Sequence, residues 1–239
     1  MAFYTDFAGH YEKVFPFRPP TRDFLDRRLP LQGRILDVGC GPGHYCAALN
    51  TGGRRCLGID LDPGMIRLAE EVYTETDFRI LGMDEIGFLD TGGFAGIFCI
   101  GNVLPHLRGS SLAGFVLAVK KLLAPGGIWI FQTVNFDPLL KSGQQDHRFP
   151  VLRLEGENLE FHRWYEDITE TGLAFHTQLV SSGEVIFQGE APLVPHMSLE
   201  YMLGHQAAGF ELLGHFGDFA ETPFDPDESR GSVYVWRRG

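Results

Sequence analysis

The chain has 239 residues, of which 44% are hydrophobic and 13% aromatic, enough for one α/β domain with an insertion and a substantial core. Its 20 basic and 31 acidic residues give a net charge of −11, which argues against nucleic acid or an anionic membrane as partner, since both need clustered Lys and Arg. The N-terminal residues show no signal-peptide pattern, and the longest nearly uncharged apolar stretch, 94–104, is far too short to span a membrane.

The first 32 residues are predicted to form a helical lead-in before the first strand. Apolar residues at helical spacing indicate a first helix, which the prolines at positions 16, 19 and 20 interrupt; these residues are Phe7, Ala8, Tyr11, Val14 and Phe15. A second helix is expected over 21–28, with Thr21 as its N-cap.

The segment from Ile35 to Gly43 is an apolar strand that runs into Asp37 and then into a loop with glycines at 39, 41 and 43. A strand that ends in such a loop, before a helix-compatible run, predicts a nucleotide-type site at the carboxyl edge of a parallel sheet. In the dinucleotide pattern G-x-G-x-x-G the third glycine would stand at His44, and the charge of Asp37 would repel a pyrophosphate. The loop thus favours a cationic ligand end, such as a sulfonium or ammonium group; the alternative is a tight strand–helix connection.

The remaining pattern predicts the order of the strands and helices. Strands are expected over 34–38, 55–60, 77–81, 96–100 and 128–134, and helices over 63–73 and 110–123. Period-2 runs over 158–168, 173–180 and 185–192 indicate an antiparallel insertion, after which a helix over 198–208 and strands over 211–216 and 232–237 resume the main fold. We expect an α/β fold: a doubly wound, Rossmann-like, mostly parallel seven-stranded sheet with an antiparallel C-terminal strand pair and a small antiparallel β insertion after strand 5.

Three segments together resemble class I S-adenosylmethionine-dependent methyltransferases: 35–43, 58–69 and the Pro-Gly-Gly turn within 123–130. The resemblance covers about residues 33–137 closely. It implies S-adenosyl-L-methionine as cofactor, S-adenosyl-L-homocysteine as product, and Asp60 as the acceptor of hydrogen bonds from both ribose hydroxyls. It divides the chain into a helical lid (1–32), a cofactor-binding domain (33–147 and 197–239) and the insertion (148–196).

The resemblance also implies a set of cofactor-binding residues, in which Tyr11 closes over the methionine moiety and Met83 and Asp84 hold the adenine. For Tyr11 the alternative is a core aromatic on an amphipathic helix. The whole set is Tyr11, Asp37, Gly39, Cys40, Gly41, Asp60, Leu61, Met65, Met83, Asp84, Ile100 and Asn102.

The segment 99–107 is similar to the Gly-Asn-Ser-x-x-His-Leu segment of glycine and sarcosine N-methyltransferases and their bacterial relatives, and 135–137 to their Asn-Tyr-Asp. This likeness implies that the Ile100 carbonyl faces the cofactor's ammonium group and that Asn102 lies beside the methyl group. Asn102 and His106 are the candidate catalytic residues, with His106 as base; the alternatives are a loop asparagine bonded to backbone and a packing histidine. Val134 replaces the Arg that holds the substrate carboxylate in those enzymes, which disfavours glycine or sarcosine as substrate.

Further departures from the pattern are Ala95 and Gly82, each at a position where the family usually has an acid. In the insertion, strand alternation places His162, Trp164 and Glu166 on one face and Phe161, Arg163 and Tyr165 on the other, with His176 able to join either. The inserted sheet is expected to roof the acceptor site or to form a homodimer surface. No spacing of His and Cys suggests a metal site, and the four cysteines (40, 46, 56 and 99) are expected to be buried and reduced, as in a cytoplasmic protein.

The favoured function is therefore methylation of an N or O atom of a small molecule by proximity and orientation, for which no catalytic side chain is essential. A nucleic-acid acceptor is disfavoured because no basic stripe and no Asp/Asn-Pro-Pro-aromatic segment occurs. The alternatives are an NAD(P)-dependent oxidoreductase on a Rossmann fold and a catalytically silent cofactor-binding protein.

Overall fold

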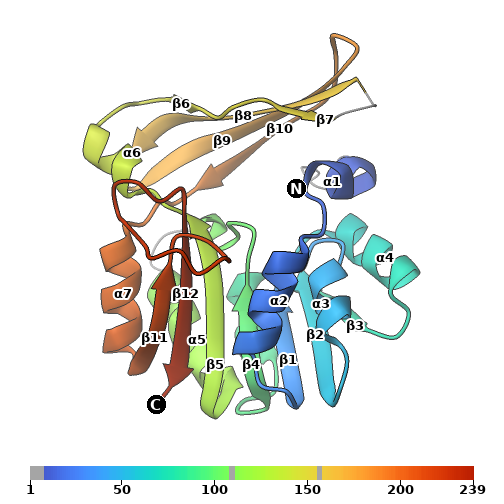
Figure 1. The fold of residues 1–239 in the computed structure, drawn as a ribbon, viewed down its shortest axis with the longest axis vertical. Coiled ribbons are helices and arrows are strands. Elements are labelled where there is room, and N and C mark those ends of the chain that lie inside the picture. Colours follow the sequence, from blue (N-terminus) through green and yellow to red (C-terminus); the bar gives the residue numbers. More distant parts are fainter. Residues whose placement is uncertain (1–7, 108–110, 155–157) are drawn as a thin grey trace.

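The computed structural model describes residues 8–107, 111–154 and 158–239. Two sheets dominate it: a seven-stranded sheet, and a five-stranded sheet that lies across the carboxyl ends of the parallel strands (Figure 1). Phe7 and Ser110, which were expected to belong to helices, lie outside the described residues.

The seven-stranded sheet has the order β11-β12-β5-β4-β1-β2-β3. β1 to β5 run parallel, while β12 pairs antiparallel with both β5 and β11, so the predicted doubly wound sheet with a C-terminal antiparallel pair is confirmed. The strands are β1 (Gly33–Val38), β2 (Arg54–Asp60), β3 (Asp77–Ile80), β4 (Phe94–Cys99), β5 (Leu123–Val134), β11 (Phe210–Phe216) and β12 (Gly231–Arg238).

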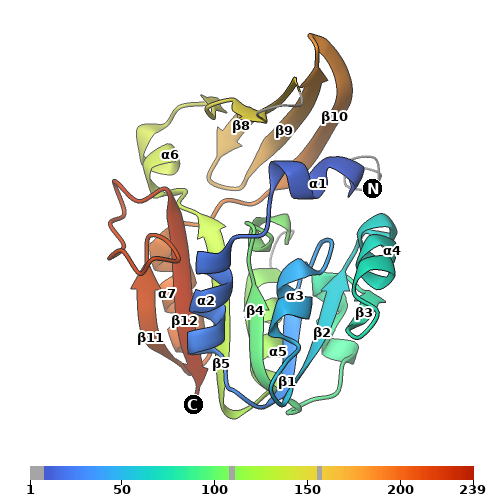
Figure 2. The same cartoon turned by 45° about the vertical axis from the view of Figure 1, so that its right-hand side comes forward.

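Helices cover both faces of this sheet (Figure 2). The helices α2, α3 and α4 pack with Ile35 and Phe98 on one face, and α5 and α7 pack with Leu36 and Trp129 on the other, which follows from the alternation of side chains along each strand. The bounds are α2 (Pro19–Arg28), α3 (His44–Leu49), α4 (Pro63–Val72), α5 (Ser111–Leu122) and α7 (Ser198–Ala207), with the short 3₁₀ helices η1 (Met83–Phe88) and η2 (Leu104–His106). None of the helices in the described ranges has the length and apolar character needed to cross a membrane.

The five-stranded sheet is antiparallel throughout, as the period-2 pattern predicts. Its long strands β8, β9 and β10 lie side by side, and the short strands β6 and β7 both pair with β8. The helix α1 packs Val14 and Phe15 against Leu159, Phe161 and Leu179 of this sheet, so the N-terminal segment joins the two sheets. The bounds are α1 (Ala8–Val14), β6 (His147–Arg148), β7 (Leu152–Leu154), β8 (Leu159–Thr169), β9 (Gly172–Ser181) and β10 (Glu184–Leu193).

The sequence pattern misses five short elements and misplaces the start of one strand and one helix. β5 begins at Leu123, five residues earlier than expected, because the Pro-Gly-Gly turn forms a register shift within the strand instead of preceding it. α2 begins at Pro19, with Arg18 and not Thr21 at its N-cap, because proline fits the first turn of a helix. The missed elements are α6 (Asp137–Ser142), β6, β7, η1 and η2; each has six residues or fewer, too few for a periodic signal.

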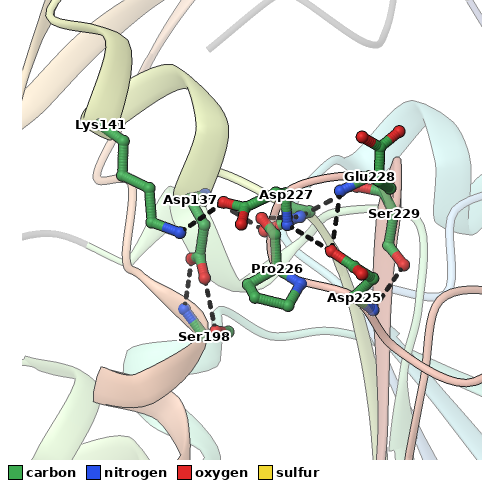
Figure 3. Close-up of polar contacts among 9 residues, drawn as sticks. Asp137, Lys141, Ser198, Asp225, Pro226, Asp227, Glu228 and Ser229 are labelled. Carbon is green, nitrogen blue, oxygen red and sulfur yellow. Dashed lines mark hydrogen bonds and ion pairs between the residues drawn. The ribbon is translucent and has the colours of Figure 1, made fainter.

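The segment 135–137 anchors the end of β5 to the C-terminal part of the chain (Figure 3). The side-chain amide of Asn135 donates to the carbonyls of Pro226 (3.0 Å) and Ser229 (2.9 Å). The buried carboxylate of Asp137 accepts from the backbone N–H (2.7 Å) and the hydroxyl (2.6 Å) of Ser198, at the start of α7. These two side chains therefore have a structural role: they tie the end of β5 to the loop 226–229 and to the start of α7.

His205 is a fully buried histidine in the core beside β5. Its Nε2 accepts a hydrogen bond from the indole N–H of Trp129 (3.0 Å), and its Nδ1 lies 2.7 Å from the carbonyl of Tyr201, so Nδ1 carries the proton. Burial lowers the pKa of His205 from 6.5 to about 4.

We predict that the free energy of unfolding falls as the pH decreases from 6.5 toward 4. A histidine with a lowered folded-state pKa binds its proton more readily in the unfolded chain, so its contribution is complete above the unfolded pKa and lost below it. Burial likewise lowers the pKa values of His106 and His215 to about 4, with the same sign. Urea denaturation at pH 7 and pH 5 measures this free energy. The variant His205→Gln should be less stable than the wild type at pH 7, but its free energy of unfolding should change less between the two pH values. Equal differences in both proteins would contradict the assignment.

Candidate cofactor and acceptor site

The glycine loop after β1 is held by the neighbouring strand β2. The backbone N–H groups of Gly39 (2.8 Å) and Cys40 (2.9 Å) both donate to the carbonyl of Ile59, and that of Gly41 donates to Oδ2 of Asp60 (2.9 Å). Gly39 has φ +73°, and a Cβ there would lie 2.6 Å from a methyl group of Val103. The first glycine is therefore required both by backbone conformation and by packing.

Asp60 shapes the loop from the end of β2. Its Oδ1 accepts from the backbone N–H of Asp62 (2.9 Å), while Oδ2 binds Gly41, so the carboxylate joins the glycine loop to the start of α4. Burial raises its pKa, although the hydrogen bonds from Asp62 and Gly41 oppose this effect. Each carboxylate oxygen has lone pairs left for a further donor such as a ribose hydroxyl.

Asp37 is the second carboxylate of this edge, and it differs from Asp60 in its surroundings. Its side chain is buried, yet it has no hydrogen-bond or ion-pair partner within the described residues. Burial raises its pKa well above the usual value, and the nearby charge of Asp60 raises it further. A buried carboxylate in this state is stabilised by a cation, because the attraction offsets the cost of its desolvation.

A cavity of about 870 Å³ opens above the glycine loop and reaches the five-stranded sheet. This volume lies within the range of about 300–1,000 Å³ that small-molecule sites occupy. Asp37, Gly39 and Ile100 contribute from the ends of β1 and β4, and Tyr11 from α1, while the opposite wall comes from β8 and β9. The two sheets and α1 thus enclose one site (Figure 1).

The structure brings seven of the predicted site residues to this cavity: Tyr11, Asp37, Gly39, Cys40, Ile100, Asn102 and His106. The ring of Tyr11 lies over the loop, since a Cβ at Gly41 would be 3.7 Å from its Cζ atom and hydroxyl oxygen. Six other predicted residues do not line the cavity: Gly41, Asp60, Leu61, Met65, Met83 and Asp84. Of these, Met65 is a core residue of α4, whereas Leu61 and Asp84 are exposed beside β2 and β3. Their role in binding a nucleoside stays a prediction.

Asn102 joins the end of β4 to the end of β5. It has φ +63°, and its Oδ1 accepts from the backbone N–H of Val134 (2.8 Å). Next to it, the N–H of Gly101 donates to Oε1 of Gln132 (2.8 Å). The side-chain oxygen of Asn102 is thus used in fixing the loop, while the residue itself lines the cavity.

His106 lines the same cavity from η2. Burial lowers its pKa to about 4, so that the imidazole is neutral at pH 7. A neutral imidazole is able to accept a proton from an acceptor hydroxyl or ammonium group.

The inner face of the five-stranded sheet carries Phe161, Arg163 and Tyr165 of β8, which line the cavity with Phe175 and Thr177 of β9. On the opposite face His176 stacks on Trp164 (5.1 Å between ring centroids) and lies 3.3 Å from Glu166, so it belongs to the His162 set. The sequence pattern separated the two faces but did not indicate which of them meets the cavity. Gln132 and Thr177 were missed because neither stands in a recognisable motif.

Comparison with known proteins gives one family match and many structural neighbours. Residues 35–127 match a family model described as a methyltransferase domain. A ubiquinone biosynthesis O-methyltransferase of Xanthomonas oryzae pv. oryzae is 29% identical over 138 residues, which span 56% of this chain and 56% of that relative. The chain therefore matches only about half the length of this relative.

The structural neighbours cover nearly the whole chain. The CcbJ methyltransferase of Streptomyces caelestis superposes with a TM-score of 0.78 and 21% identity over 93% of this chain and 97% of its own. CalS10 of Micromonospora echinaspora, an amino pentose methyltransferase solved with S-adenosylmethionine bound, superposes with a TM-score of 0.67 and 21% identity over 91% of this chain and 88% of its own. At these identities the likeness concerns the fold.

Proposed function

We propose that this chain uses S-adenosyl-L-methionine to methylate an N or O atom of a small molecule held beneath the five-stranded sheet. The match of residues 35–127 to a methyltransferase domain, and the fold shared with CcbJ and CalS10, support this proposal. The observation that carries the proposal is the Asp37 carboxylate, which is buried at the edge of the cavity and has no hydrogen-bond or ion-pair partner in the described part of the chain. The cofactor offers a sulfonium and an ammonium group, and either cation fits this carboxylate. A pyrophosphate, as in a dinucleotide, would meet repulsion there.

The remaining parts of the site agree with this cofactor. Gly39 lines the cavity, and the ring of Tyr11 lies over Gly41. Asp60 at the end of β2 keeps lone pairs for the ribose hydroxyls. When bound, the cofactor supplies an electrophilic methyl group on a good leaving group. The chain's own task is then to orient the acceptor and to exclude water, which the cavity walls perform.

The acceptor is proposed to be a small molecule because the cavity is enclosed by α1 and the five-stranded sheet, and because the net charge is −11. The relative in Xanthomonas is named for O-methylation, and CalS10 is named for an amino pentose. Within the described residues, we propose that the part of 1–32 that lines the cavity forms the lid of the site and that the part of 148–196 that lines it forms the acceptor roof.

The proposal is tested by isothermal titration with S-adenosylmethionine, S-adenosylhomocysteine and NADH, followed by transfer of a labelled methyl group to a panel of phenols, amines and amino sugars. Binding of both adenosyl compounds and labelling of one class of acceptor are expected. Preferential binding of NADH would instead support the oxidoreductase alternative, and binding without transfer to any acceptor the silent one.

His106 is proposed as the base that removes the acceptor's proton. We predict that His106→Gln lowers kcat by about 10²- to 10⁴-fold, the usual contribution of a general base, while the Kd of S-adenosylhomocysteine changes less than threefold. Because the pKa of His106 is about 4, the wild-type rate should show no titration of this group between pH 6 and 8 and should fall only as the pH approaches 4. Steady-state rates of the variant over this pH range check this, and an unchanged kcat would reduce His106 to a packing residue.

A further inference from the structure

Arg163 lies on β8 in the wall of the cavity, and its side chain is half-buried. Its Nε is fully buried and has no hydrogen-bond partner among the described residues. No carboxylate forms an ion pair with it in the described part of the chain. Its neighbours are the rings of Phe149 and Phe161, whose centroids lie 5.3 Å and 5.8 Å from Cζ.

Arg54 shows how this chain otherwise satisfies a buried guanidinium. Its side chain forms an ion pair with Asp26 and donates to the carbonyls of Pro30 (2.7 Å), Asp26 (2.9 Å) and Leu29 (3.2 Å). Arg163 has only the faces of aromatic rings, a weak attraction that does not replace the hydration that its buried part has lost. Burial accordingly lowers its pKa. The cavity is the side from which a compensating anion reaches it.

A second unsatisfied donor stands directly beside Arg163. Thr177 is its cross-strand partner on β9 and is 2% exposed, and its hydroxyl has no hydrogen-bond partner within the residues that the structure describes. Residues opposite each other on neighbouring antiparallel strands have side chains about 5 Å apart on the same face. The guanidinium and the hydroxyl are therefore placed to donate to one group that enters the cavity.

The rest of this wall is aromatic. Tyr165 packs edge-on against Phe149 (5.0 Å) and Phe175 (5.5 Å), and all three rings line the cavity with Arg163. Planar, delocalised guanidinium groups match carboxylates through two parallel hydrogen bonds. The wall thus offers flat apolar surfaces for a ring and two donors for a planar anion.

We infer that Arg163 and Thr177 bind a carboxylate on the methyl acceptor, so that the acceptor is an aromatic carboxylic acid; this rests on the proposed function and names its substrate class. Asp37 and Arg163 then place opposite charges on opposite walls of the cavity. The carboxylate of Asp37, at the end of β1, faces the cationic cofactor, and the guanidinium on the opposite wall faces the anionic acceptor.

To test this inference, benzoate and benzamide are titrated into the protein saturated with S-adenosylhomocysteine, and their binding is measured by calorimetry. The two probes share the same ring and have nearly the same size, but they differ in charge. Benzoate should bind at least tenfold more tightly than benzamide. Arg163→Met should abolish that preference while changing the Kd of benzamide less than twofold. Arg163→Lys should keep part of the preference, and Thr177→Val should raise the Kd of benzoate severalfold. Arg148→Met is the matched control, because Arg148 lies on the same sheet over Trp164, outside the cavity lining, and should leave the preference unchanged.

Two further measurements, the binding of S-adenosylhomocysteine and the thermal midpoint, distinguish a failure of the proposed function from a failure of the inference about Arg163. If S-adenosylhomocysteine does not bind the wild type, the proposed function fails; if it binds but benzoate has no advantage, or neither probe binds, only the inference about Arg163 fails. A purely structural Arg163 would lower the thermal midpoint when replaced and leave the benzoate preference intact, and that result would also overturn the inference. Removal of an uncompensated cation should instead leave the midpoint of Arg163→Met equal to or above that of the wild type.

Discussion

Asp60→Ala is expected to weaken the binding of S-adenosylmethionine by about 10- to 150-fold, which corresponds to about 1.5–3 kcal/mol for a charge-assisted hydrogen bond. Two effects add in this variant. The ribose hydroxyls lose their carboxylate, and the N–H groups of Gly41 and Asp62 lose the acceptor that fixes the glycine loop. Isothermal titration with S-adenosylmethionine and S-adenosylhomocysteine measures the loss, which should be similar for both compounds because they share the ribose.

Asp90→Ala is the control for this prediction. Asp90 is an exposed carboxylate between η1 and β4, beside Arg34, and its removal makes the net charge less negative by the same amount without touching the loop. Its affinity should equal that of the wild type. An unchanged affinity of Asp60→Ala would show that the ribose is held elsewhere, and the interpretation of the motif at 58–60 would then be wrong.

The fold could be predicted because the sequence patterns that indicate its strands and helices are local. Each parallel strand is a short apolar run between turn residues, and side-chain period changes from helical to alternating at the inserted sheet. The short elements escaped prediction for the complementary reason. α6 and η1 have six residues each, and their positions follow from tertiary contacts, such as that between Asp137 and Ser198, which no local pattern reveals.

The residues of the candidate site also fall into a group that local patterns predicted and a group that they did not. Asp37, Gly39 and Asn102 were found because they stand at fixed positions in motifs next to strand ends, where parallel strands meet at one edge. The acceptor wall was not found, since it depends on which face of β8 turns toward that edge. Strand alternation grouped Phe161, Arg163 and Tyr165 correctly, but only the placement of the second sheet shows that this group, and not the His162 group, lines the cavity.

The segment 135–137, whose likeness to Asn-Tyr-Asp was noted in the sequence, has a structural role. Asn135 donates to the carbonyls of Pro226 and Ser229. Asp137 accepts two hydrogen bonds from Ser198 (Figure 3). They do not line the cavity. Their effect on the site is indirect, because they hold the end of β5, which carries Gln132 and Val134 in the cavity wall.

Asp37→Asn is expected to change stability and cofactor binding in opposite directions. The variant removes a buried charge that lacks a partner, so the protein without cofactor should become more stable, with a thermal midpoint about 2–6 °C higher. The same change removes the partner of the cofactor's cation, and S-adenosylmethionine should bind about tenfold to a hundredfold more weakly. Differential scanning calorimetry and isothermal titration measure the two effects.

The pH dependence sharpens this prediction. Because burial raises the pKa of Asp37, its carboxyl group takes up a proton more readily in the folded protein, and the cost of its charge decreases as the pH falls. Cofactor affinity of the wild type should therefore decrease toward acidic pH as this carboxylate is neutralised, whereas the affinity of Asp37→Asn should be nearly constant over the same range.

Asp137→Asn is the matched control, since it makes the same substitution at a second buried carboxylate that does have donors. Ser198 gives Asp137 two short hydrogen bonds (Figure 3). An asparagine at this position keeps the bond from the Ser198 N–H and donates to the Ser198 hydroxyl, but both bonds lose the negative charge that strengthens them. Asp137→Asn should therefore lower the thermal midpoint where Asp37→Asn raises it. If both variants lower it, Asp37 is satisfied in the protein without cofactor, and the charge of the site does not select a cation.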